Sequence, residues 1–109
     1  MLKPIFGNDV VEKILFYMYY CKKAYASKLA NVYDIRINGI QQQLTRLEQG
    51  GILVSVLVGR TRMYELNPRY PFAKELIILI KKASEFLPEG YADKYYMERN
   101  RPRQKGKPL

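Results

Sequence analysis

The sequence predicts a mainly α-helical domain with one small β-hairpin, which is an α+β fold class. Apolar residues recur at helical spacing in several segments, and Gly50-Gly51 ends one of them, as glycine does just past a helix. Two stretches of strand-forming residues then flank a turn at Gly59-Arg60. A chain of 109 residues can bury one core, so we expect one domain over residues 1–90.

The first expected helix begins after Asn8 or Asp9, either of which suits an N-cap, and continues through VVEKILFYMYYCKK. It ends in cations, which favour the carboxyl end of a helix dipole. Only Glu12 and Lys13 interrupt its apolar residues before Lys22. A helix with apolar residues on nearly every side should be buried on more than one side.

The last expected helix, PFAKELIILIKKASEFL over residues 71–87, also presents apolar residues in several directions, and Pro88 ends it. Two such helices suggest a homodimer in which they pack across a two-fold axis. The alternative is that they pack on each other within one chain. The expected interface residues are Val11, Leu15, Met18, Tyr19, Leu76, Ile77 and Ile80.

Between these terminal helices the sequence predicts a short helix, a turn, a longer helix and the hairpin. The short helix covers about residues 25–33, and the turn is Tyr33-Asp34-Ile35. The longer helix covers about residues 36–49, with Ile37, Ile40, Leu44 and Leu47 in one apolar stripe. The expected strands are residues 52–58 and 61–66. This order predicts a winged helix-turn-helix with a three-helix core, a wing and a C-terminal dimerisation helix.

The face of the longer helix opposite its apolar stripe is polar, mostly uncharged and rich in side-chain amides. Amides can pair with the donor and acceptor groups of adenine in the major groove, whereas an ordinary solvated face more often carries Lys and Glu. Arginines near the hairpin turn could contact phosphates or enter the minor groove. The expected DNA-binding residues are Arg36, Asn38, Gln41, Gln42, Thr45, Arg46, Gln49, Arg60 and Arg62.

Composition limits the classes of function. The net charge of +9 and the pI near 9.7 favour a polyanionic partner, either nucleic acid or an anionic membrane surface. Histidine is absent and Cys21 is the single cysteine, so we expect no metal, no cofactor, no catalytic activity and no intrachain disulfide. This cysteine usage favours a cytoplasmic protein.

The two ends of the chain raise separate questions. Residues 14–21 imitate the apolar part of a signal peptide, but charged residues flank them and the run is too short to span a bilayer. Residues 91–109 form an expected basic, flexible tail, with five cations from Arg99 to Lys107. Whether this tail contacts DNA stays open.

Five segments resemble the ArsR-like winged-helix transcriptional regulators, closest to a branch associated with nucleotidyltransferases. They are IFGN at 5–8, YASKLA at 25–30, QQQLTRLEQGGIL at 41–53, GRTRMYELNP at 59–68 and YPFAKELIILIKK at 70–82. The resemblance implies a homodimer on a two-fold-related operator, with the longer helix in the major groove, the hairpin as a wing and the terminal helices at the dimer interface.

The sequence departs from this family at three points. Asp34 replaces a favoured glycine, and Arg36 replaces a Ser or Thr cap. The paired Cys or His residues of metal-sensing members are missing, and no nucleotidyltransferase motif is present. We therefore expect a sequence-specific, repressor-like regulator of double-stranded DNA, with no membrane partner. Two alternatives remain: a winged-helix protein-interaction module, and a non-specific nucleic-acid binder driven by the basic tail.

Overall fold

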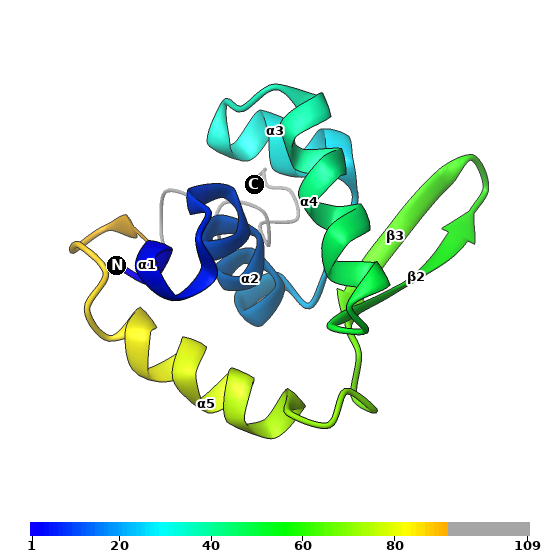
Figure 1. Cartoon of the computed structure of the whole chain (residues 1–109). Coiled ribbons are helices and arrows are strands. Elements are labelled where there is room, and N and C mark those ends of the chain that lie inside the picture. Colours follow the sequence, from blue (N-terminus) through cyan, green and yellow to red (C-terminus); the bar gives the residue numbers. More distant parts are fainter. Residues whose placement is uncertain (92–109) are drawn as a thin grey trace, which may run out of the picture.

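The computed structural model describes residues 1–91, and a small antiparallel sheet lies at one side of its helices, with the β2–β3 hairpin projecting outward (Figure 1). The mainly helical fold with a small sheet confirms the predicted class. The elements in chain order are α1 (Lys3–Phe6), α2 (Asp9–Cys21), β1 (Lys23–Ala24), α3 (Ala26–Tyr33), α4 (Ile37–Gln49), β2 (Leu53–Val58), β3 (Thr61–Leu66) and α5 (Ala73–Ser84). The sequence analysis missed the short α1 and β1, and it made the last helix too long at both ends.

The sheet has three strands, and not the two of a simple hairpin. The strand order is β1-β3-β2, because Lys23 pairs with Glu65 and Ala24 with Tyr64 on the far side of β3. The hairpin itself closes between Val58 and Thr61 through the expected two-residue turn. Gly59 has φ of 65°, which suits glycine at the first position of such a turn. The pairing with β1 anchors the base of the hairpin beside α2 and α3.

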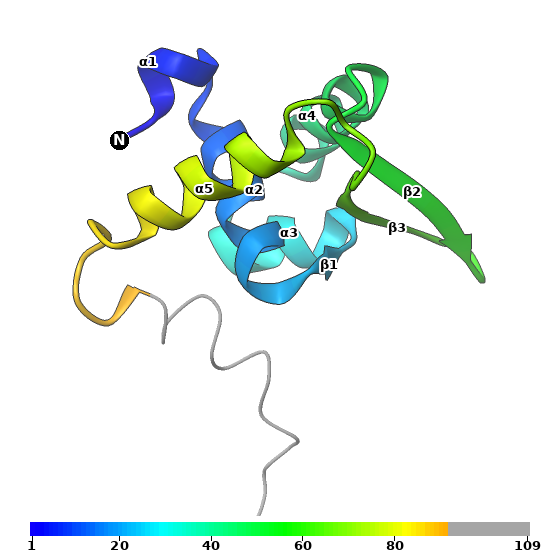
Figure 2. The same ribbon diagram turned by 90° about the horizontal axis from the view of Figure 1, so that it is seen from below.

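Helix α2 is the centre of the core. It packs against α1, α3, α4, α5 and two strands of the sheet, and its residues 14–18 are all buried. Figure 2 shows α5 lying alongside it. The all-round apolar character of this helix is therefore explained within one chain, because a helix with neighbours on every side needs no polar face. The core also includes Leu29, Ile40, Leu44, Leu53 and Ile80.

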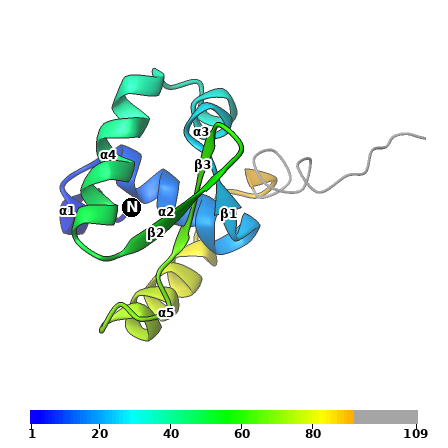
Figure 3. The same ribbon diagram turned by 90° about the vertical axis from the view of Figure 1, so that its right-hand side faces the viewer.

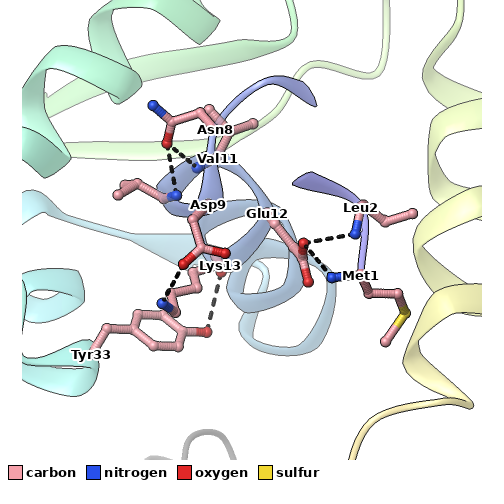
Figure 4. A network of polar contacts seen from close by, with 9 residues as sticks. Met1, Leu2, Asn8, Asp9, Val11, Glu12, Lys13 and Tyr33 are labelled. Atoms are coloured by element: carbon pink, nitrogen blue, oxygen red, sulfur yellow. Dashed lines mark hydrogen bonds and ion pairs between the residues drawn. The ribbon is translucent and has the colours of Figure 1, made fainter. Parts of the chain in front are cut away.

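Polar contacts secure the first turn of α2 (Figure 4). The side-chain oxygen of Asn8 accepts hydrogen bonds from the backbone N–H of Val10 at 2.7 Å and of Val11 at 3.2 Å, so Asn8 is the N-cap. Glu12, which interrupts the apolar sequence, accepts from the backbone N–H of Leu2 at 2.8 Å. Lys13 pairs with Asp9 at the surface. Glu12 thereby holds the start of the chain, and α1 with it, against α2.

Candidate nucleic-acid interface

The longer helix α4 begins one residue later than expected, and the two unusual residues before it are accommodated by backbone geometry. Asp34 adopts a left-handed conformation, with φ of 54° and ψ of 52°, and its N–H donates to the carbonyl of Ala30. Aspartate is among the non-glycine residues that tolerate this region best. The turn therefore reaches the geometry that glycine would give.

Arg36 occupies the N-cap position of α4 without any side-chain capping bond. Its carbonyl accepts hydrogen bonds from the N–H of Gly39 at 3.0 Å and of Ile40 at 3.3 Å, so the backbone alone starts the helix. The guanidinium group is not used for capping. Arg36 is exposed, and its side chain stands at the amino end of α4.

The outward face of α4 is formed by the polar residues that the sequence analysis selected. Its exposed side chains are Asn38, Gln41, Gln42, Thr45, Arg46 and Gln49. The first four of them line one shallow surface depression. Gln43, at the flank, is half-buried and accepts a hydrogen bond from Arg46 at 3.1 Å. The helix therefore presents a row of amide and hydroxyl groups with one cation, and no carboxylate among them.

The apolar stripe of α4 is shorter than expected. Ile40, Leu44 and Leu47 are buried, but Ile37 is exposed, so its assignment to the buried stripe was wrong. The physical reason is position: Ile37 is the first residue of α4, at the end of the helix. It lines a hollow between the start of α3, the start of α4 and the hairpin turn.

This hollow lies between α4 and the β2–β3 hairpin. Its lining includes Tyr25, Ser27, Gln41, Arg60 and Arg62. Figure 3 is seen from the side towards which the β2–β3 hairpin projects in Figure 1, so the hairpin lies in front of the helices, and Arg60 and Arg62 line the hollow with residues of α3 and α4. Tyr25 and Ser27 were not selected from the sequence, because no local pattern reveals that a strand turn will lie beside them. The two wing arginines and the start of α4 thus belong to one continuous surface.

A hydrogen-bonded chain holds the wing against the other end of α4. The Ser55 hydroxyl of β2 donates to a carboxylate oxygen of Glu48 at 2.5 Å, and Arg62 of β3 donates to the same hydroxyl oxygen at 3.0 Å. Burial raises the pKa of the nearby Tyr64 phenol, the Glu48 carboxylate adds to that rise, and Arg62 opposes it. The neutral phenol and the charged pair therefore form one polar cluster at the base of the wing.

Gly39 lies within α4 without a steric reason inside the chain. A Cβ atom added there would meet only the Cγ2 methyl of Ile35, at 3.9 Å, which is ordinary van der Waals contact. Glycine within a helix costs about 1 kcal/mol relative to alanine. A tight fit against the preceding helix therefore does not explain this glycine.

The expected dimer residues divide into two groups. Val11, Leu15, Met18 and Ile80 are buried within one chain, so in this conformation they offer no surface to a second copy. Tyr19 and Leu76 are half-buried, and Ile77 is exposed on α5 beside Ile78. Part of the apolar surface of the terminal helices is thus used by α2 and α5 packing on each other, and part remains at the surface of α5.

The remaining chemistry of the described residues is limited. Cys21 is half-buried and packs against the core. Within residues 1–91, no three His, Cys, Asp or Glu side chains come close enough together to bind a metal ion. The same part of the chain contains no helix long and apolar enough to cross a membrane. The expected basic tail lies outside the described residues, except for Tyr91 at its start.

No protein-family model matches the chain, and no curated protein is significantly similar to it. Solved structures resemble it in fold. The transcriptional regulator Tm0710 of Thermotoga maritima is 17% identical, with a TM-score of 0.58 over 90% of this chain and 77% of that one. The adhesin competence repressor AdcR of Streptococcus pyogenes is 16% identical, with a TM-score of 0.57 over 89% and 75%.

A third similar structure is the MarR family transcriptional regulator SPO1453 of Silicibacter pomeroyi, which is 15% identical, with a TM-score of 0.54 over 84% of this chain and 68% of that one. At such identities the likeness establishes the winged helix-turn-helix fold and assigns the chain to no family. The ArsR-like branch suggested by the sequence motifs has no specific support from these structures, one of which is a MarR family regulator.

Proposed function

We propose that this protein is a sequence-specific regulator that binds double-stranded DNA with α4 in the major groove and the β2–β3 hairpin as a wing. The observation that carries the proposal is the exposed polar face of α4, which shares one surface with Arg60 and Arg62 of the wing. Amide side chains pair with base edges, and arginines contact phosphates or bases. The similar solved structures include a repressor and two proteins described as transcriptional regulators, which supports this class of function.

Different residues of the proposed DNA interface would contact the bases and the backbone. Asn38, Gln42, Thr45 and Arg46 face outward along the middle of α4 and would read base edges, with Gln41 and Gln49 at the flanks. Arg36, Arg60 and Arg62 would hold the backbone on either side. The tail after residue 90 would add phosphate attraction that does not depend on base sequence.

The proposal includes a homodimer, because a two-fold protein matches a two-fold operator. The exposed apolar side chains on and next to α5 support it. Phe72, Ile77, Ile78 and Phe86 are all exposed in one chain, and Leu76 is half-buried beside them. A second copy packing against α5 would remove this surface from water. Sedimentation of the protein, and of an Ile77→Glu/Ile78→Glu variant, would measure this: a two-fold drop in mass supports the dimer, and a monomeric wild type contradicts it.

Selection of bound duplexes from a random pool, followed by sequencing, tests the function directly. We expect a two-fold-symmetric site. The variant Gln42→Ala/Arg46→Ala should bind that site at least tenfold more weakly, since each base contact contributes roughly 1 to 3 kcal/mol of discrimination, and its loss on random duplex should be smaller. Lys81→Ala, an exposed cation on α5, is the matched control and should leave the preference unchanged. Equal losses on both DNAs would refute base reading by α4.

A second measurement separates this function from its alternatives. Deleting residues 99–109 should leave the sequence preference intact and reduce the dependence of binding on salt. Complete loss of binding would favour a non-specific binder driven by the tail. Failure of the full chain to bind any duplex at low salt would favour the protein-interaction module.

A further inference from the structure

The outer half of strand β2 is apolar on both faces. Val56, Leu57 and Val58 are 57, 61 and 56% exposed, and they are consecutive, so their side chains alternate between the two faces of the hairpin. We call these three residues the wing tip. Single exposed apolar side chains are ordinary, but an unbroken exposed run on a projecting element marks a contact surface. Neither face of the wing tip is covered by another part of residues 1–91.

Cations border this apolar surface. Arg60 stands in the turn next to Val58, and Arg62 is the cross-strand partner of Leu57. Strand β2 has no charged residue, and it is one of the two edge strands of the sheet in the part of the chain that the structure describes. An exposed edge strand without charges or proline is normally avoided, since it invites association. The occupant of this surface should therefore combine an apolar wall with negative charge beside it.

The minor groove of duplex DNA has this combination. Its walls are the carbon-bound hydrogens of deoxyribose, and phosphates border it on both sides. The hairpin projects on the side of α4 (Figure 1), and Arg60 and Arg62, next to the wing tip, line the hollow together with Gln41 of α4. A helix in the major groove would therefore direct the wing towards the neighbouring minor groove. Apolar side chains that enter a minor groove act as wedges and bend the duplex.

The width of the minor groove and the thickness of the hairpin determine whether the wing tip can enter the groove. A B-form minor groove is about 6 Å wide. A β-ribbon with side chains on both faces is about 10 Å thick, judged from the spacing of stacked sheets. The turn at Gly59-Arg60 alone could enter an undeformed groove, but Val56, Leu57 and Val58 could not. Contact with these residues therefore demands a wider groove.

We propose that the wing tip inserts into the minor groove, packs against the deoxyribose walls and widens the groove, so that the protein bends the DNA that it binds. This inference rests on the proposed function. It adds a source of specificity, because steps that deform easily, such as TA, are favoured at positions the protein does not read. It also disfavours duplex RNA, whose wide, shallow minor groove displays 2′-hydroxyl groups.

The test uses the full chain and a duplex of about 30 base pairs with central TA steps and a fluorophore at each end. Energy transfer reports the bend, and titration reports affinity. The variant is Val56→Thr/Leu57→Thr/Val58→Thr, in which threonine keeps the β-branched shape that strands favour. Two controls are Val54→Thr, at the base of the same strand, and Ile5→Thr, an exposed position on α1. Leu57→Thr alone serves if the triple variant does not fold.

We expect the wild type to bend the duplex by roughly 40° or more. The triple variant should bind about tenfold to a hundredfold more weakly, as loss of a buried leucine-sized contact implies, with no bend and the same salt slope. Both controls should match the wild type. The same duplex as RNA should bind weakly to wild type and triple variant alike.

Other results would overturn the inference. Tight binding by the wild type without bending leaves the proposed function in place and refutes the wedge. A triple variant that bends DNA as the wild type does would also refute the wedge and leave the proposed function in place. The last measurement is binding of the wild type and the triple variant to vesicles in which about a third of the lipid is anionic. If the triple variant loses vesicle binding but keeps DNA binding, the wing tip is a membrane contact and not a DNA wedge. No binding to duplex by the wild type refutes the function and the inference together.

Discussion

Replacing Gly39 by alanine should strengthen the fold and weaken DNA binding. Nothing within residues 1–91 requires glycine at this position: the added methyl would contact only Ile35, at 3.9 Å. Alanine favours a helix interior over glycine by about 1 kcal/mol. Since no clash offsets this gain, the free energy of unfolding should rise by about that amount.

The effect of Gly39→Ala on the affinity for DNA should be opposite to its effect on stability. Gly39 lies on the same turn of α4 as Gln42 and within reach of the polar face, so a bare backbone there allows a phosphate or base edge to approach closely. A methyl group would hold the ligand away. We expect the selected duplex to bind about tenfold more weakly, a change of about 1.4 kcal/mol. The variant would then be more stable and less active.

Two assays separate these effects. Thermal unfolding should show a rise in Tm of about 4 to 8 °C per kcal/mol for a domain of this size, and titration of the selected duplex gives the affinity. Gly51→Ala is the matched contrast: Gly51 has φ of 82°, so alanine there should lower the Tm. A lower Tm for Gly39→Ala would refute the packing argument. A higher Tm with unchanged affinity would refute close approach by DNA.

Three further predictions follow from the turn before α4 and from the base of the wing. Asp34→Gly should raise the free energy of unfolding by about 0.5 to 1 kcal/mol in urea melts, because glycine adopts the left-handed conformation without strain; a loss would show that the aspartate side chain contributes a contact. Glu48→Ala should lower the free energy of unfolding by about 1 kcal/mol, since the Ser55 hydroxyl loses its acceptor, and Glu48→Gln should lower it by less. Equal stability of wild type and Glu48→Ala would contradict the role of this hydrogen bond. Burial raises the pKa of Tyr64, so its neutral form is favoured in the folded state; the stability advantage of wild type over Tyr64→Phe should be complete below about pH 10 and decline as the pH rises through the higher folded-state pKa. Urea melts of both proteins from neutral to alkaline pH measure this, and a difference that stays constant would count against it.

Local sequence patterns were sufficient for most of the elements. The spacing of Ile40, Leu44 and Leu47 placed α4 to within one residue, and the glycine pair ended it correctly. The strands around Gly59-Arg60 were placed equally well, because turn chemistry and β-branched residues act over a few neighbouring positions. The exposure of the polar face of α4 follows from the same periodicity. Its role in DNA binding remains a prediction.

Features that depend on residues far apart in the sequence could not be predicted from local patterns. Strand β1 is two residues long and exists because Lys23 and Ala24 pair with β3, some forty positions away. Ile37 has the right spacing for the core but is exposed at the first position of α4. The apolar surface of α2 suggested a second copy, yet neighbours from the same chain cover it.

The sequence by itself therefore determined the four longer helices approximately, the hairpin, the basic charge and the amide-rich face, since each depends on residue type and short-range spacing. The tertiary structure alone decided which apolar residues are core and which remain exposed. It also joined Glu48, Ser55 and Arg62 into one cluster and left the wing tip uncovered. The reason is physical: periodicity defines the faces of an element, but only the packing of distant elements decides what covers each face.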